Sequence, residues 1–150
     1  MASQTENALP TGTRRRHRAI GVAATVAAAA AVWVVGEPLL GYDLVVKQPG
    51  QAPMDLGLDA IAVVTLVASL LGWALLAGLE RLTDRAAAIW TALALLVLAL
   101  SFLPLFGVES SGGSKAILAL LHVAVGAVLI PAFWRTRRTG RAERPVPAAS

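Results

Sequence analysis

Four long apolar runs constrain the fold of this chain more than any other feature. They occupy residues 19–36, 57–79, 86–106 and 116–134, and Asp59 is the only Asp, Glu, Lys or Arg within them. Helices of these lengths measure about 27 to 35 Å, which suits a hydrocarbon core of about 30 Å. In lipid, only a helix satisfies its own backbone polar groups over such a run. The runs therefore predict an all-α, polytopic membrane four-helix bundle with an up-down-up-down arrangement.

The composition supports a membrane protein. Hydrophobic residues make up 57% of the 150 residues, against about 45–50% in soluble domains, and charged residues make up 15%, against about 25%. A soluble domain of this size leaves a large share of its surface in water, so this apolar excess requires a bilayer. The chain has no cysteine, which excludes disulfides, thiolate catalysis and Cys-ligated metals.

The remaining segments are expected to be tails and loops. Residues 1–18 and 135–150 are polar and basic, and we expect them to be disordered tails. Residues 37–56 form a proline-containing loop, whose apolar part at 39–46 we expect at the membrane interface or against the helix ends. Residues 107–115 contain two adjacent glycines among serines, a pattern typical of a flexible turn.

The distribution of Lys and Arg predicts the orientation in the membrane. Eleven of these 13 residues lie in the two terminal flanks and in the turn between the second and third runs. Only Lys47 and Lys115 lie on the opposite side. Because cytoplasmic segments carry an excess of Lys and Arg, we expect both termini to be cytoplasmic and the protein to be multi-pass in the bacterial cytoplasmic membrane.

The basic ends also suggest a partner. Arg135, Arg137 and Arg138 follow the last run directly, and we expect them to lie near anionic lipid headgroups. No basic face on a folded module is apparent, so nucleic-acid binding is not expected. The alternative interpretation of the first run is a cleaved signal peptide, although the run exceeds the usual apolar stretch of about 7–15 residues.

Small and weakly polar residues recur at helical spacing and predict the packing faces. In lipid, such residues let helix backbones approach closely. In the second run one face carries Ala62, Thr65, Ser69 and Gly72, and in the fourth run one face carries Ala119, His122 and Gly126. Tryptophan adds a second signal: Trp33, Trp90 and Trp134 are expected in the interfacial belts, whereas Trp73 is expected to pack within the bundle.

His122 is the leading candidate for a functional residue, because it is an ionisable residue within an apolar run. Thr65 of the second run is expected at the level of His122, Ser69 shares the face of Thr65, and Asp59 lies one to two turns above. These four residues form the candidate intramembrane polar site, in which an Asp–His pair would hold or pass a proton. The preferred interpretation is a neutral histidine bonded to a serine, a threonine or a backbone carbonyl.

Metal and cofactor sites are not expected. The two histidines, His17 and His122, lie at opposite sides of the predicted membrane, so zinc lacks a second nitrogen ligand and haem a second axial histidine. Neither a phosphate-binding glycine loop nor a nucleophile elbow is present. The charged turn between the second and third runs, where Arg81 and Asp84 are close enough to pair, is expected to cap two helices.

Several short motifs are spread along the four runs and the first loop. They are Gly41-Tyr42-Asp43-Leu44, Gly72-Trp73-Ala74-Leu75-Leu76, Leu79-Glu80-Arg81, Trp90-Thr91, Leu121-His122 and Ala127-Val128-Leu129-Ile130-Pro131. On these motifs the chain resembles a family of small four-helix integral membrane proteins of unknown function from actinobacteria. The resemblance covers about residues 19–135 and implies a cytoplasmic-membrane location and this topology, without an activity, cofactor or catalytic residue.

Two functions follow as expectations. The first is a non-enzymatic accessory or scaffold protein of the cytoplasmic membrane, which acts through helix packing with a second copy or a larger membrane partner. The alternative is a small transporter or channel subunit that uses His122 and Asp59. An intramembrane enzyme is disfavoured because the sequence offers no nucleophile–base pair or metal set.

Overall fold

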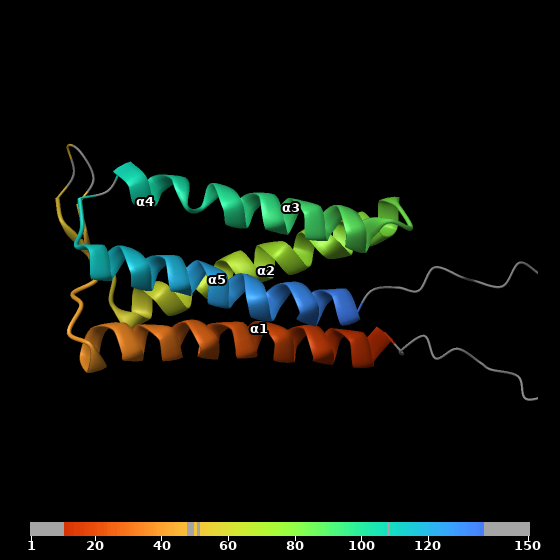
Figure 1. Cartoon of the computed structure of the whole chain (residues 1–150). Helices are drawn as coiled ribbons and strands as arrows, with labels where there is room; N and C mark the ends of the chain where they lie inside the picture. The colour runs from red at the N-terminus through yellow and green to blue at the C-terminus, as the bar shows by residue number, and fades with distance from the viewer. Residues whose placement is uncertain (1–10, 48–49, 51, 108, 137–150) are drawn as a thin grey trace, which may run out of the picture.

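The computed structural model describes residues 11–47, 50, 52–107 and 109–136. Consecutive long helices run in opposite directions, so α1 begins and α5 ends at the same end of the molecule (Figure 1). The helical elements are α1 (Thr11–Val34), the π-helical turn η1 (Val35–Leu39) that continues it, α2 (Leu58–Leu82), α3 (Ala86–Leu100), α4 (Leu103–Gly107) and α5 (Gly112–Arg135).

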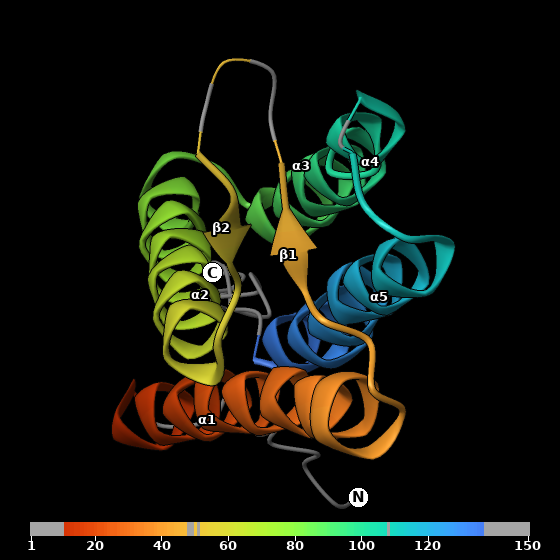
Figure 2. The same ribbon diagram turned by 90° about the vertical axis from the view of Figure 1, so that its left-hand side faces the viewer.

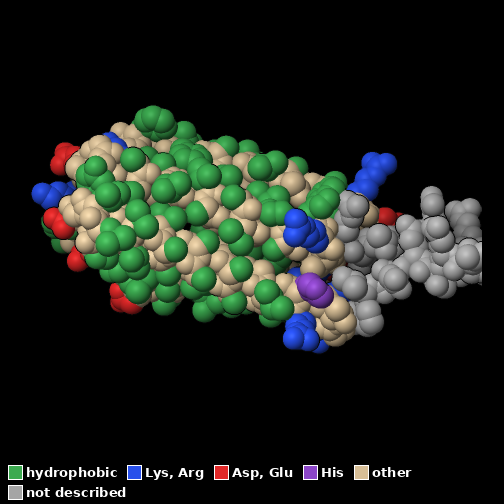
Figure 3. Space-filling model, turned by 60° about the horizontal axis from the view of Figure 1, so that its bottom comes forward, with side chains coloured by type: hydrophobic (Ala, Val, Ile, Leu, Met, Phe, Trp, Pro, Cys, Tyr) green, Lys and Arg blue, Asp and Glu red, His purple; other side chains and the backbone are tan. Residues whose placement is uncertain are grey.

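Four helical spans are long and apolar enough to cross a membrane. They cover Gly12–Leu39, Leu58–Leu82, Ala86–Gly107 and Gly112–Arg135, with mean hydropathies of 2.1 to 2.4. Hydrophobic side chains cover the middle of the molecule, and Lys, Arg, Asp and Glu gather at its two ends (Figure 3). A continuous apolar surface of this extent is unsuited to water and suits lipid. The four predicted spans are thus confirmed, and they indicate a multi-pass membrane protein.

Helix α1 begins at Thr11, well before the expected start at residue 19. The prediction of a disordered tail over residues 1–18 is therefore wrong for its second half, while residues 1–10 lie outside the described part of the chain. Arginine is a good helix former, and Arg18 is buried against other helices, so the basic segment continues the helix. Of the predicted C-terminal tail, Arg135 is the last residue of α5, and residues 137–150 also lie outside the described part.

Helix α5 begins at Gly112, although residues 107–115 were expected to form a flexible turn. Ser111 is its N-cap, and the Ser111 hydroxyl oxygen accepts a hydrogen bond of 3.0 Å from the backbone N–H of Ser114. Such a cap satisfies one of the free donors of the first turn. The ring of Tyr42 lies directly against Gly113, where no side chain would fit. The two glycines are therefore helical, and the second one makes room for the loop.

The third span is divided into α3 and α4 by a turn at Ser101 and Phe102. Pro104 has no N–H to bond the carbonyl of Leu100, and its ring would clash with that carbonyl in a continuous helix. The Ser101 hydroxyl donates to the carbonyl of Leu98 at 2.6 Å and satisfies a carbonyl at the end of α3. The expected single helix over residues 86–106 is thus interrupted, although α4 continues roughly in line with α3 (Figure 1).

The loop after η1 contains a two-stranded antiparallel sheet of β1 (Val45–Val46) and β2 (Met54–Asp55). Figure 2 shows this sheet across the end of the bundle. Leu44, which precedes the sheet, is fully buried, whereas Leu39 and Leu40 of the same apolar segment are 70% and 57% exposed. The indole N–H of Trp33 donates to the carbonyl of Leu56 at 3.1 Å, which ties the loop to α1.

Helix α1 lies along both α2 and α5 and makes most of the interhelical packing (Figures 1 and 2). The packing forms two apolar clusters, one near each end of the bundle. One contains Val22, Leu76, Ala86, Trp90, Leu129 and Phe133, and the other contains Ala29, Leu44, Ile61, Ile117 and Leu121.

Trp90 belongs to the first cluster, and its expected place in an interfacial belt is wrong. The side chain is 3% exposed, and its ring centroid lies 5.2 Å from that of Phe133. Its indole N–H donates to the carbonyl of Gly72 at 2.8 Å. The glycine leaves that carbonyl accessible, so the tryptophan buries its apolar body and still satisfies its polar atom. Trp73 packs against the same cluster, as expected.

Candidate functional site

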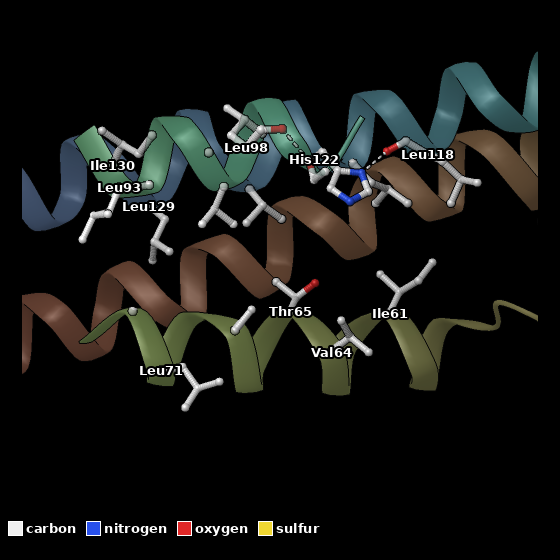
Figure 4. Close-up of a pocket in the computed structure, with 18 of the residues that line it drawn as sticks. Ile61, Val64, Thr65, Leu71, Leu93, Leu98, Leu118, His122, Leu129 and Ile130 are labelled. Carbon is white, nitrogen blue, oxygen red and sulfur yellow. Dashed lines mark hydrogen bonds between the residues drawn. The ribbon is translucent and has the colours of Figure 1, made fainter. Parts of the chain in front are cut away.

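A cavity of about 580 Å³ lies between α2, α3 and α5, and it is called the groove below. Nearly all of its lining side chains are apolar (Figure 4). The residues with polar side-chain atoms are Thr65, Trp90, Ser101 and His122, and the indole of Trp90 and the hydroxyl of Ser101 already donate to backbone carbonyls. Among the described residues, His122 and Thr65 are therefore the two groove-lining residues with a polar side-chain atom that makes no hydrogen bond: Nε2 of His122 and the hydroxyl of Thr65.

The groove exists because the three helices approach one another unevenly. Leu98 of α3 lies against Gly126 of α5, and a side chain at Gly126 would meet it. On α2, small side chains such as Ala60 and Ala68 line the groove, so space remains between α2 and the other two helices. Small residues thus bring α3 and α5 together and leave a gap beside α2.

The groove opens to the side of the bundle. Val64 and Leu71 of α2 and Val97 of α3 line it and are each about two-thirds exposed, at 66%, 66% and 65%. Trp90 and Leu121 are buried and line its inner part. The exposed residues at the opening, which form the lips of the groove, lie within the spans that are long enough to cross a membrane. In a bilayer, the groove would therefore face the lipid between α2 and α3.

His122 faces the groove and carries one internal hydrogen bond. Its Nδ1 lies 2.7 Å from the carbonyl oxygen of Leu118. A carbonyl can only accept, so Nδ1 carries the proton and donates. The other ring nitrogen, Nε2, points across the groove towards α2 (Figure 4). His122 is thus bonded to a backbone carbonyl, and with a single ring proton, on Nδ1, the Nε2 atom is left as an acceptor.

Thr65 is buried on α2 and lies across the groove from His122 (Figure 4). Its hydroxyl faces the groove and makes no hydrogen bond with any residue that the structure describes. Thr65 thus lies near the level of His122 along the bundle. The unbonded Nε2 of His122 and the unbonded hydroxyl of Thr65 therefore lie on opposite walls of a largely apolar groove.

The other two members of the candidate site lie elsewhere. Ser69 is fully buried and does not line the groove, and its hydroxyl has no hydrogen-bond partner within the described ranges. Asp59 is exposed in the first turn of α2, where a carboxylate interacts favourably with the helix dipole. At 100° per residue it is about 120° around the helix from Thr65, and it does not line the groove, so it faces away from it. The expected Asp59–His122 pair is therefore not formed.

Comparison with known proteins assigns the chain to a family. The model of a family of unknown function, DUF6069, matches residues 10–139. The chain belongs to this family. No curated protein and no solved structure gave a match. The matched region of this DUF6069 protein contains all four spans and the groove.

A second polar cluster of the DUF6069 protein was missed in the sequence. Arg18 of α1 is 5% exposed, and its guanidinium forms a two-pronged ion pair with Glu80 of α2, with N–O distances of 2.5 and 3.2 Å. Arg18 also donates to the hydroxyl and carbonyl oxygens of Thr136, which follows α5, at 3.0 and 3.1 Å. The cluster ties the N-terminal part of α1 to the C-terminal ends of α2 and α5.

The sequence had placed Glu80 in a charged turn where Arg81 pairs with Asp84. Both of these side chains are exposed, and no ion pair joins them in the described part of the chain. The signal for the Arg18–Glu80 pair is the level of these two residues in the membrane. Arg18 directly precedes the first run and Glu80 directly follows the second, so antiparallel helices bring them to the same end. A buried carboxylate requires such a partner.

The described residues contain no group of three or more His, Asp or Glu that could hold a metal ion. In the groove, the Thr65 hydroxyl and the imidazole of His122 lie on opposite walls and are not hydrogen-bonded to each other. A nucleophile requires a base within hydrogen-bond reach. A polar group bound between the two walls could reach both side chains.

Proposed function

We propose that this DUF6069 protein is a non-enzymatic accessory or scaffold protein of the bacterial cytoplasmic membrane that acts by binding a molecule within the bilayer. The observation that supports the proposal is the groove between α2, α3 and α5, which opens sideways at the level of the spans. Concave, mostly apolar sites with a few placed polar groups are typical of ligand binding.

Photo-cross-linking in intact cells tests this proposal. A photoreactive phenylalanine analogue replaces Val97 on the lip of the groove, and a matched control replaces Ile20, which is exposed on α1 outside the groove. A binding site predicts a discrete adduct at position 97 and only scattered products from bulk lipid at position 20. Equally scattered products at both positions would contradict the proposal.

Both termini are proposed to be cytoplasmic. The argument is the clustering of arginines at the end where α1 begins and α5 ends, against Lys47 and Lys115 at the other end. Because the chain has no cysteine, single cysteines at Ala52 and Asp84 report orientation without background. Both positions are exposed. An impermeant thiol reagent on intact spheroplasts should label Ala52→Cys and leave Asp84→Cys unlabelled, and the reverse pattern would contradict this orientation.

A transporter or channel subunit remains the alternative, and it is less well supported. It required Asp59 and His122 to act together, yet Asp59 faces away from the groove. Proteoliposomes with an internal pH-sensitive dye provide the test. We expect proton flux no greater than in empty liposomes. A flux that disappears in His122→Ala would favour the alternative over the accessory function.

A further inference from the structure

We infer that the groove binds one single-chain lipid whose small, uncharged head group carries a hydroxyl that meets His122 and Thr65. This inference rests on the proposed function, because it requires the groove to be a binding site. It adds the chemical class of the ligand and the two side chains that recognise its head group. Three properties of the groove support it: its width, its polar pair and its depth.

The width of the groove fits one hydrocarbon chain. Helix α2 lines the groove from Ala60 to Leu75, which is about 22 Å at 1.5 Å per residue. The volume of about 580 Å³ is spread over that length and is open along one side, so the groove is a long trough rather than a closed channel. An α-helix with its side chains is about 10–12 Å across. One extended hydrocarbon chain fits along the groove, whereas a transmembrane helix of a partner would pack over its exposed edges.

The polar pair fits a hydroxyl. With Nδ1 of His122 donating to Leu118, the Nε2 atom is a free acceptor. The hydroxyl of Thr65 can donate across the groove. One ligand hydroxyl satisfies both, because it donates to Nε2 and accepts from Thr65. In an apolar surrounding, leaving such groups without partners is costly, so a bound hydroxyl is favoured over an alkane at this place.

The depth of the pair limits the head group. His122 lies about 15 Å from the first residue of α5 and about 20 Å from the last, so it is near the middle of that span. A phosphate or another charged group is costly at such depth, which excludes ordinary phospholipid head groups. From Thr65 to Leu75 the groove continues for about 15 Å, towards Trp90, and accommodates the tail. A long-chain alcohol has the required features.

The probe for this inference is hexadecan-1-ol with a diazirine in mid-chain, and its methyl ether is the control ligand. The purified full-length protein in lipid nanodiscs is illuminated with increasing probe, and labelled peptides are quantified by mass spectrometry. We expect saturable labelling by the alcohol near Gly72, Trp90 and Leu129, about 10 Å along the groove from Thr65. Unlabelled hexadecan-1-ol should displace the probe. The ether should label weakly and without saturation.

Variants assign the head-group contacts. We expect the half-saturating probe concentration to rise about tenfold in His122→Leu and about threefold or more in Thr65→Val, as befits one lost hydrogen bond each. Thr25→Val is the matched control, because Thr25 is fully buried on α1, outside the groove, and bonds the carbonyl of Gly21. His122→Gln, which keeps an acceptor, should recover part of the affinity and serves if His122→Leu does not fold.

Equal labelling by alcohol and ether, or unchanged affinity in both folded His122→Leu and folded Thr65→Val, would overturn the inference. If His122→Leu does not fold, unchanged affinity in Thr65→Val alone would overturn it. Cross-linking at Val97 separates this failure from that of the proposed function. A discrete protein adduct at Val97 would leave the scaffold function intact and show that a partner, and not a lipid chain, covers the groove. If position 97 gives only scattered products, both the lipid inference and the proposed function are overturned.

Discussion

Arg18 illustrates how one residue serves two purposes. In the sequence it belongs to an arginine cluster that predicts orientation, and in the structure it is a buried cation held by Glu80 and Thr136. A paired guanidinium is well suited to this place because its fork matches a carboxylate. The neighbouring Arg15 and Arg16 are exposed, so only the proposed contribution to orientation applies to them.

Arg18→Met should destabilise the bundle by about 3 kcal/mol, because it leaves Glu80 buried without its cation. The free energy of unfolding in mixed micelles measures this loss. Arg15→Met, at an exposed position, should change it by less than about 0.5 kcal/mol. The double variant Arg18→Met, Glu80→Gln should recover part of the loss, and a double variant as unstable as Arg18→Met would contradict the explanation.

The site could be predicted in part at this scale. Thr65 and His122 share a level because helix lengths and alternating directions fix how far each residue lies along its span, and both are visible in the sequence. The rotation of a helix about its own axis depends on contacts with its neighbours. For that reason Asp59 was expected in the site and instead faces away, and the groove itself was not predicted.

At the scale of elements, the hydropathy of the chain predicted four spans, and it misplaced several of their ends. Apolar runs are local properties of the sequence, whereas ends depend on caps and distant contacts. The start of α1 is supported by Arg18 and its partners, and the start of α5 by the cap at Ser111. The turn between α3 and α4 reflects Pro104, whose effect on a helix is local and was readable in the sequence.

Ser111→Ala should loosen the first turn of α5, because it removes the acceptor for the backbone N–H of Ser114. A loss of about 1 kcal/mol corresponds to amide exchange about fivefold faster over the first turn. Hydrogen exchange in detergent measures this rate. Ser110→Ala, which alters a serine outside the helix, is the control and should leave these amides unchanged. An equal effect of both variants would argue against the cap.

Pro104→Ala should join α3 and α4 into one helix, because it restores the missing N–H and removes the clash with the carbonyl of Leu100. Amide exchange at Phe102 and Leu103 should slow at least tenfold. Pro53→Ala, in the loop before α2, is the matched proline control. Unchanged exchange at Phe102 would mean that contacts of α4, and not Pro104, impose the turn.

At the scale of the molecule, α1 is the centre of the packing rather than a peripheral anchor. Thr25 and Ala29 are completely buried, and α1 contacts both α2 and α5 along its length. A cleaved signal peptide would be absent from the mature core. We therefore expect the intact mass of protein purified from membranes to include residues 11–36, and a mass that begins after residue 36 would contradict this packing.

The sideways opening of the groove has a consequence for how its occupancy is set. A molecule that enters between α2 and α3 arrives by lateral diffusion within one leaflet or the other and never crosses water. Occupancy then follows the mole fraction of the ligand in the bilayer, and the aqueous concentration matters only through partitioning. A change in the amount of this lipid in the membrane would change the occupancy of the groove directly. A water-soluble competitor of the right shape would not displace the lipid, because it does not enter the bilayer.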